Sequence, residues 1–183
     1  MRCQAGVIFL ALLVLSAPAG ASSTQDNLMF NRLIAGLKKP SSLPDLPALQ
    51  NAAVRSIAAD VTNLQDGEWE EREWVYLAVN HEVLVAEGRR SSTQAEVIAN
   101  KPGAEQEELG FRLSMESKAH LLALRDAMTD VDGKTWTVVD LTVERSGKYD
   151  LAFSYDAPPR LNGDLLHSPL TGLLERYRKA QLK

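Results

Sequence analysis

The stretch WTVVDLTVERSGKYDLAFS, residues 136–154, alternates apolar and polar side chains on both sides of a short polar turn. This alternation is typical of two strands that each bury one face. A three-residue loop over 145–147 places Leu141 opposite Leu151 on the buried face, whereas a two-residue loop would place Leu151 opposite Thr142. We therefore predict an antiparallel hairpin with the three-residue loop, in which the glycine takes the left-handed conformation that closes a bulge.

The rest of the chain alternates between helical and strand-like patterns. Apolar residues at helical spacing predict helices over 49–64, around 121–128, and after Ser168, the expected N-cap of a C-terminal helix. The other predicted strands are 74–79 and 82–86, joined by a turn at Asn80 and His81, and a half-buried strand over 109–115. We expect a loop over 89–108, with one edge strand near 96–98. These elements predict an α+β fold, a mostly antiparallel sheet with helices packed on it, in a single domain.

The first residues have the order of a secretory signal peptide. Arg2 precedes an apolar run over 7–15, and small residues follow. Cleavage fits best after Ala21, and a second small-x-small site ends at Ala19. The alternative is an uncleaved anchor, but the apolar run is well short of the ~20 residues that a membrane-spanning helix needs. We expect a periplasmic location without stable membrane insertion.

The sequence therefore divides into three parts: a signal peptide over 1–21, a helical and proline-rich segment over 22–47, and an α+β domain over 48–183. The only cysteine, Cys3, lies in the signal peptide, so we expect no disulfide and no lipid anchor in the exported chain. That chain keeps 19 basic and 24 acidic residues, a net charge of about −5. Such a charge argues against nucleic acid as a partner and suits a basic protein, although it also serves solubility alone.

Few residues form a pattern that carries chemistry. The three histidines, His81, His120 and His167, are far apart in sequence and have no zinc-site spacing. Neither a Gly-x-Ser-x-Gly elbow nor a glycine-rich phosphate loop is present. Paired acids such as Asp130 and Asp132 are typical of solvated turns. We therefore predict that the protein is not an enzyme and binds no cofactor or metal.

Acidic residues surround two tryptophans, Trp69 and Trp74. These acidic residues are Asp66, Glu68, Glu70, Glu71 and Glu73. Exposed carboxylates beside a large aromatic ring make a good protein-binding surface, because the ring anchors a partner and the charges steer it. The alternative interpretation is that both tryptophans belong to the core and the acids are a solvated rim.

The order of several features resembles the YezG-type immunity proteins over about residues 48–180. These features are a tryptophan-bearing strand over 69–79, a middle helix, a strand over 136–143, Gly147-Lys148-Tyr149 and a strand ending in Tyr155-Asp156. The resemblance implies an α+β fold and a non-enzymatic function, the binding and neutralisation of a toxin. Familiar members are cytosolic, whereas this chain carries a signal peptide. We therefore hypothesise a periplasmic immunity protein against a toxin that acts in the cell envelope, such as a type VI secretion effector.

Loops held by a rigid sheet are where recognition residues tend to gather. The candidate partner-binding residues are Trp69, Glu70 and Glu71, and then Asp156, Arg160 and Asp164 in the loop after Tyr155. Two other functions stay open. One is a small-molecule or peptide-binding module with a pocket lined by Trp74, Tyr76, Trp136 and Tyr155. The other, ranked last, is an envelope hydrolase that uses His167 and Asp164.

Overall fold

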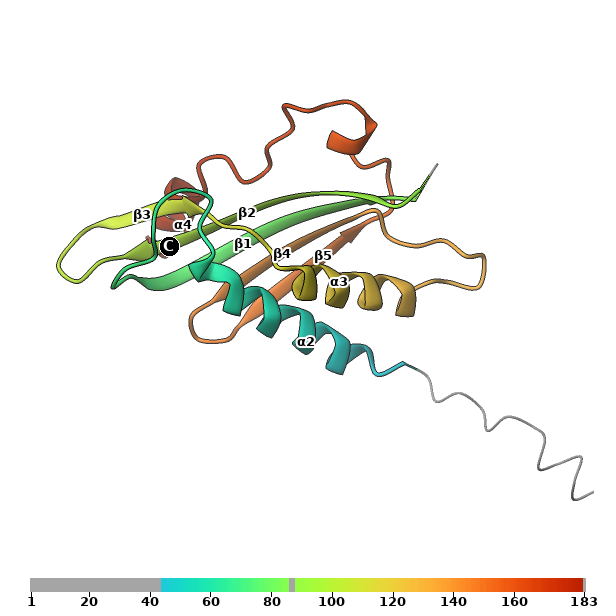
Figure 1. Cartoon of the computed structure of the whole chain (residues 1–183), viewed down its shortest axis with the longest axis horizontal. Coiled ribbons are helices and arrows are strands. Elements are labelled where there is room, and N and C mark those ends of the chain that lie inside the picture. The colour runs from blue at the N-terminus through green and yellow to red at the C-terminus, as the bar shows by residue number, and fades with distance from the viewer. Residues whose placement is uncertain (1–43, 86–87, 183) are drawn as a thin grey trace, which may run out of the picture. The chain divides into compact units, whose positions relative to one another are not determined.

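The computed structural model describes residues 44–85 and 88–182. The predicted signal peptide and nearly all of the segment over 22–47 lie outside this range. The described part is an α+β domain with an antiparallel sheet, as predicted, and the sheet has five strands in the order β3-β2-β1-β4-β5 (Figure 1). The strands are β1 (Glu73–Leu84), β2 (Arg90–Asn100), β3 (Gln106–Gly110), β4 (Val138–Glu144) and β5 (Tyr149–Ser154). The helices are α2 (Leu46–Ala59), α3 (Met115–Ala127) and α4 (Leu173–Gln181), with single 3-10 turns η1 (Asp60–Thr62) and η2 (Arg160–Asn162).

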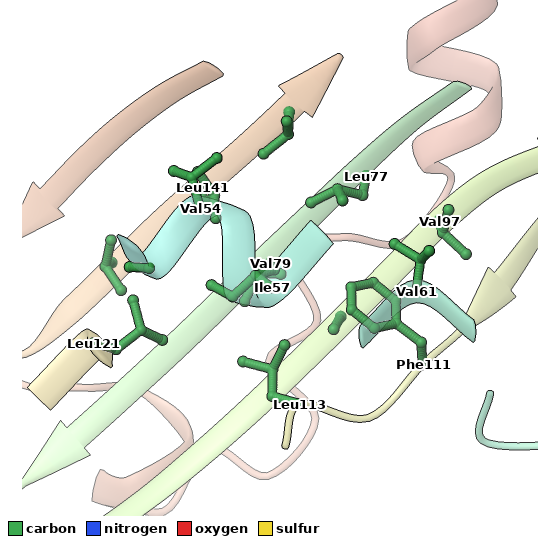
Figure 2. Packing of buried hydrophobic residues seen from close by; sticks show 14 of the residues in the cluster. Val54, Ile57, Val61, Leu77, Val79, Val97, Phe111, Leu113, Leu121 and Leu141 are labelled. Carbon is green, nitrogen blue, oxygen red and sulfur yellow. The ribbon is translucent and has the colours of Figure 1, made fainter. Parts of the chain in front are cut away.

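The main face of the sheet, which carries the odd-numbered residues of β1 from Leu77 to Val83, packs against α2 and α3. Leu77 and Val79 of β1 and Leu141 of β4 are buried in one hydrophobic cluster with Val54 and Ile57 of α2 (Figure 2). Burying one such side chain fully contributes about 1.5–3 kcal/mol. This face therefore supplies most of the hydrophobic stabilisation of the domain.

The second face of the sheet carries the even-numbered residues of β1 from Tyr76 to Glu82 and is covered by the C-terminal part of the chain. Figure 1 shows α4 and the segment over 155–172 on the side of the sheet opposite α2 and α3. Ile98 of β2 packs there with Leu170 and Leu173, and the rings of Tyr76 and Tyr177 lie 5.1 Å apart. No helix in the described ranges is long and apolar enough to cross a membrane.

Helix α2 begins earlier than the sequence pattern suggested. Asp45 is the N-cap, and its Oδ1 accepts a hydrogen bond from Ala48 N (3.1 Å). Pro47 lies in the first turn, where a missing N–H costs nothing because that donor has no partner within the helix. Pro47 therefore belongs to the helix and not to the preceding turn segment, and the predicted helix over 49–64 corresponds to the rest of α2 and η1.

Strand β1 is unbroken, so the turn predicted at Asn80 and His81 is wrong. Both side chains are buried within the strand and lie on opposite faces of the sheet. Asn80 Nδ2 donates to Asp140 Oδ1 (2.7 Å), and His81 Nδ1 lies 2.7 Å from Thr93 Oγ1. Polar groups on neighbouring strands bind the Asn80 amide and the Nδ1 atom of His81, whereas His81 Nε2 is buried without a hydrogen-bond partner among the described residues.

The predicted loop over 89–108 is also wrong, because β2 and β3 form a second hairpin there. Ile98 lies opposite Glu108, and Gly103, with φ of 76°, supplies the turn. Strand β2 carries glutamine and glutamate at alternate positions on the second face. Taken from the sequence alone, this pattern indicates a solvent-exposed face. It does not reveal that the C-terminal part of the chain covers this face.

The strand predicted over 109–115 is only partly present. Phe111 and Leu113 are buried on the main face as expected, but β3 ends before Phe111. Met115 is exposed and begins α3, because the side chain of Ser114 caps the helix at this point. The N-cap interrupts the alternating pattern one residue before its last member.

The predicted C-terminal hairpin is confirmed together with its register. Leu141 lies opposite Leu151, and Glu144 N donates to Lys148 O (2.8 Å). Gly147 closes the three-residue loop with φ of 89°. The requirement that both strands bury their apolar residues on one face was therefore sufficient to select the loop length.

Helix α4 begins later than expected. Gly172 is its N-cap, with φ of 70°, and Ser168 lies in the preceding turn, where its carbonyl oxygen accepts a hydrogen bond from Thr171 N (3.3 Å). The left-handed glycine prevents the helix from extending back to Ser168. The N-cap prediction at Ser168 is therefore wrong, while the helix itself is present.

Gly147→Ala tests the left-handed loop position. We expect the free energy of unfolding to fall by about 1 kcal/mol, because an L-residue is strained in this conformation. Urea unfolding followed by circular dichroism measures the loss. Ser146→Ala in the same loop is the control and should change stability by less than about 0.5 kcal/mol. Equal stability of the two variants would contradict the assigned loop.

Candidate partner-binding site

The acidic loop, residues 63–72, joins η1 to β1 and is attached to the chain that leaves β3. Gln65 N donates to Gly110 O (2.8 Å). Arg112 reaches back with Nη1 to Leu64 O and Nη2 to Gln65 O, both at 2.8 Å. These bonds satisfy backbone groups that a free loop would leave to water, so the first half of the loop is held in place.

Arg72 anchors the second half of the loop. Its side chain is only 11% exposed, and its Nε donates to Glu107 Oε1 on β3 (2.6 Å). Its Nη1 donates to the carbonyl oxygens of Glu68 (2.7 Å) and Trp69 (2.9 Å). One guanidinium group thus links the carbonyl groups before and after the Trp69 Cα atom to the edge of the sheet. The planar guanidinium of arginine can make several such hydrogen bonds at once.

Glu70 projects from the tip of the loop with a left-handed backbone, φ of 52°. Its carboxylate pairs with Lys101 Nζ, and Arg72 Nη1 lies 3.7 Å away. The hydrogen bond and charge of Lys101, with a smaller contribution from Arg72, lower the pKa of Glu70 below its usual value. Glu71 is exposed and forms no ion pair with any described residue. The two glutamates therefore differ: Glu71 is the freer charge for a partner.

Trp69 and Trp74 form two walls of a groove of about 310 Å³ beside the acidic loop. Both rings are partly buried against the main core and partly exposed. The guanidinium carbon of Arg145 lies 5.1 Å from the centroid of the Trp74 ring, a cation–π geometry. The floor and remaining walls come from Ala58, Ala59, Val61, Thr62, Arg72 and Glu73. The tryptophans thus belong both to the core and to the surface, between the two interpretations of the sequence.

The second group of candidate residues is divided by the structure. Asp156 and Asp164 are exposed on the segment over 155–172. Arg160 is 7% exposed and points into the domain, so it does not offer a surface contact in this structure. The expectation that all three residues share an accessible loop surface is corrected for Arg160.

Arg160 instead fastens η2 to the second face of the sheet. Its Nε donates to Ser92 Oγ (2.9 Å), its Nη2 donates to Asn80 Oδ1 (2.6 Å), and its Nη1 lies 3.4 Å from Glu82 Oε1. The other oxygen of the fully buried Glu82 accepts a hydrogen bond from Leu161 N (3.1 Å). A buried charge needs such partners, because isolation in the interior would cost several kcal/mol.

The two groups of candidates lie at opposite ends of the sheet. The acidic loop leads into β1 at Glu73. Asp156 follows the end of β5, and this end of β5 pairs with the part of β4 that pairs with the opposite end of β1 (Figure 1). A single compact contact surface therefore does not include both groups. The acidic loop is the group with a groove beside it.

The four aromatic residues proposed for a ligand pocket do not share one. Trp136 is fully buried in the main core, and Trp74 and Tyr76 lie on opposite faces of the sheet. Tyr155 is exposed near Lys134, whose Nζ lies 5.2 Å from the ring centroid. The irregularity between Trp74 and Tyr76 in the pairing of β1 with β2 places these neighbouring aromatics on different faces.

The pairing proposed for a hydrolase shows only a backbone contact, from His167 N to Asp164 O (3.1 Å). Within the described ranges, no three His, Cys, Asp or Glu side chains cluster as a metal site would require. Asp130, one of the acidic turn residues, accepts hydrogen bonds from Asp132 N (3.0 Å) and Lys134 N (2.7 Å). This is the local turn geometry expected for that residue.

The chain matches no known protein-family model and no curated protein sequence.

Sequence reasoning missed three basic residues of this site, Arg72, Lys101 and Arg145. Arg72 is the single basic residue within the acidic run EWEEREW. A lone basic residue among acids was the only feature of the sequence that could have pointed to its structural role. Lys101 and Arg145 lie in turns distant in sequence, and only the strand order brings them beside the acidic loop.

A pair of carboxyl groups on the second face lies beneath the start of α4. Glu108 Oε2 accepts a hydrogen bond from Leu174 N (2.7 Å) and so caps the helix, while Glu96 Oε2 is buried without a partner. Burial and the interaction with the Glu108 carboxyl group raise the pKa of Glu96 from 4.5 to about 7, against the opposing charge of Arg176. Glu96 therefore holds a proton in the folded state at pH values where an unfolded chain has lost it.

The raised pKa of Glu96 predicts a stability contribution that is lost with rising pH. Between about pH 4.5 and 7 the folded state binds the extra proton, so this contribution is complete below that window and declines through it. Glu96→Gln mimics the protonated group and should remove the decline. Urea unfolding of wild type and variant across this range measures the difference between them.

Comparison with the variant is required because His81 acts in the opposite direction. Burial, with the nearby charges of Lys118 and Arg160, lowers the pKa of His81 to about 4, so its contribution is lost as pH falls from 6.5 toward 4. The difference between wild type and Glu96→Gln cancels this effect. A difference that does not change with pH would contradict the assignment to Glu96.

Proposed function

We propose that this chain is an exported immunity protein that binds and neutralises a cognate antibacterial toxin in the cell envelope. The acidic loop and its groove are the proposed contact surface. Trp69 is the anchoring side chain, and Glu70 and Glu71 are the charges that attract a basic surface of the toxin. A type VI secretion effector is the proposed class of toxin.

The anchoring of the acidic loop by Arg72 is the observation that carries this proposal. A loop that is already ordered loses little conformational entropy on binding, so more of the contact energy contributes to affinity. Arg72 joins this loop to β3, and β3 belongs to the sheet. Trp69 is thus held at the surface by the rigid part of the domain.

The charges around the groove favour a basic partner. Glu68, Glu71 and Glu73 are exposed, whereas the carboxylate of Glu70 is already paired with Lys101. The groove itself is lined by Arg72 and Arg145 as well as by Glu73 and the two tryptophans, so a cationic side chain of the partner would contact the exposed carboxylates of the loop beside the groove. The exposed carboxylates favour lysine or arginine on the part of the toxin that contacts the loop.

The proposed compartment follows from the signal-like N-terminal sequence. An inhibitor located in the periplasm meets a toxin that acts there, and the substrates available to such a toxin are peptidoglycan, lipid and envelope protein. A toxin that cleaves nucleic acid would act in the cytoplasm, where an exported inhibitor gives no protection.

The first experiment is a pull-down of the tagged protein from an envelope extract of its own cells, supplemented with the products of neighbouring genes. Mass spectrometry should identify one stoichiometric partner with a toxic domain, and co-expression of the two proteins should protect cells. Recovery of clean protein without such a partner, and no protection by co-expression, would contradict the proposal.

Glu71→Lys tests the charged part of the surface with that partner. We expect affinity to fall a few-fold, because one exposed charge pair contributes about 0.2–1 kcal/mol and its reversal adds repulsion. The loss should be larger at low salt than at 0.5 M, where screening shortens the range of the interaction to a few ångströms. Asp132→Lys, an exposed turn residue between α3 and β4, makes the same change in net charge and is the control. Equal effects of the two variants would exclude Glu71 from the interface.

Arg72→Met tests whether the ordered loop matters for affinity. Methionine keeps the aliphatic part of the side chain but removes the bonds to Glu107 and to the Trp69 carbonyl. We expect affinity for the partner to fall about tenfold, because the loop must then be ordered on binding. Isothermal titration calorimetry should show a less favourable entropy. Arg55→Met on the exposed side of α2 is the control, and unchanged binding by Arg72→Met would exclude pre-organisation by Arg72.

A further inference from the structure

The two edge strands of the sheet, β3 and β5, differ in how many contacts they make with other parts of the chain. Helix α4 and the acidic loop form hydrogen bonds with β3. From α4, Arg178 Nη2 donates to Gln106 O (3.3 Å) and Leu174 N donates to Glu108. From the acidic loop, Arg72 donates to Glu107. The edge at β5 pairs only with β4 within the described ranges (Figure 1). An unpaired strand edge is a template for another strand, and proteins usually block it.

The hydrogen-bond pattern identifies the free backbone groups of β5. Glu144 N donates to Lys148 O, so hydrogen-bonded pairs recur at every second residue from this point. Asp150 and Ala152 therefore use their backbone groups toward β4. The N–H and C=O groups of Tyr149, Leu151 and Phe153 point away from β4, toward the free edge.

The side chains of these three residues lie on the main face, next to the core. Tyr149, Leu151 and Phe153 pack against the core cluster but remain only partly buried, because no described strand lies beyond them. Strand β5 contains no proline and no bulge, the devices that commonly blunt an edge. A strand added here would satisfy free backbone groups and cover apolar surface together.

We propose that the free edge of β5 binds a second copy of this chain, with the two β5 strands antiparallel and related by a two-fold axis at Leu151. This register is the symmetric one that pairs all three outward-facing residues, with Tyr149 opposite Phe153 of the second copy and Leu151 opposite itself. Each outward residue exchanges two bonds with its opposite, which gives about six new backbone hydrogen bonds. The two sheets become one continuous sheet, a closed isologous dimer.

The symmetry of the β5 sequence about Leu151 supports the second copy as the occupant, because the aromatic Tyr149 lies opposite the aromatic Phe153 and no like charges meet. In this register Asp150 lies opposite Ala152 of the second copy, and both side chains are exposed on the second face. A shift of the axis to Asp150 would place two aspartates directly opposite each other, which destabilises a strand pair. The sequence of β5 is thus self-complementary about Leu151, and a dimer formed this way leaves the acidic loop, on the β3 side of the sheet, free.

The test uses the full chain expressed from its own first residue, studied by sedimentation velocity over a concentration series. We expect a reversible monomer–dimer equilibrium. Ala152→Asp places a second aspartate opposite Asp150 twice in the dimer and should weaken dimerisation about tenfold. Adding Asp150→Lys to that variant makes both pairs attractive and should restore dimerisation. Ala104→Asp, in the turn between β2 and β3, is the matched control and should have no effect.

The rescue separates dimerisation from folding. Ala152 also lies opposite Asp140 within one chain, so Ala152→Asp can lower the stability of the monomer, but Asp150→Lys does not remove that internal pair. Restored dimerisation in the double variant therefore reports on the pairing between copies. A wild-type chain that stays monomeric at millimolar concentration, or an Ala152→Asp variant that dimerises like Ala104→Asp, would overturn the proposal.

A cross-link tests the position of the axis. Hydrogen-bonded antiparallel pairs have Cα atoms about 5.5 Å apart, within the range that a disulfide spans. Leu151→Cys should therefore give a covalent dimer on mild oxidation, whereas Ala104→Cys and the wild-type chain, whose one cysteine is Cys3, should not. A Leu151→Cys variant that cross-links no faster than these controls would also overturn the proposal.

Discussion

The structure depends on the alternation of side chains along β1, the central strand. Leu77, Val79 and Val83, at odd-numbered positions, bury apolar side chains under α2 and α3, while Asn80 and Glu82 are equally buried on the second face. A strand with both faces buried needs partners for its polar side chains. Arg160 supplies them, and in doing so it holds the segment over 155–172 on the sheet.

This arrangement explains why a domain of modest size covers both faces of one sheet. The main face is closed by hydrophobic packing, which is non-directional and tolerant of small shifts. The second face is closed by hydrogen bonds and an ion pair, which specify one position of η2. A buried ion pair adds little net stability compared with apolar residues of similar volume, but it strongly disfavours arrangements in which one partner is left unpaired.

The candidate binding surface uses the same device at a less buried position. Arg72 does for the acidic loop what Arg160 does for η2: a guanidinium with several hydrogen bonds attaches an irregular segment to the sheet. The difference lies in what each segment exposes. The segment held by Arg160 covers the sheet, whereas the loop held by Arg72 presents Trp69 and Glu71 beside a groove. The β5 edge, in contrast, has no such attachment among the described residues.

The sequence by itself determined the local features whose physical cause is local. The three-residue loop at Gly147, the helical stripes and the α+β class follow from periodicity and from the need to bury apolar residues on one side. The strand position of Asn80 and the interior position of Arg160 depend on contacts between residues 60–80 positions apart in the chain, such as that of Asn80 with Asp140. Burial of a polar side chain becomes favourable only once its partner is in place, so only the tertiary structure could decide which polar residues are turns, which are surface and which are core.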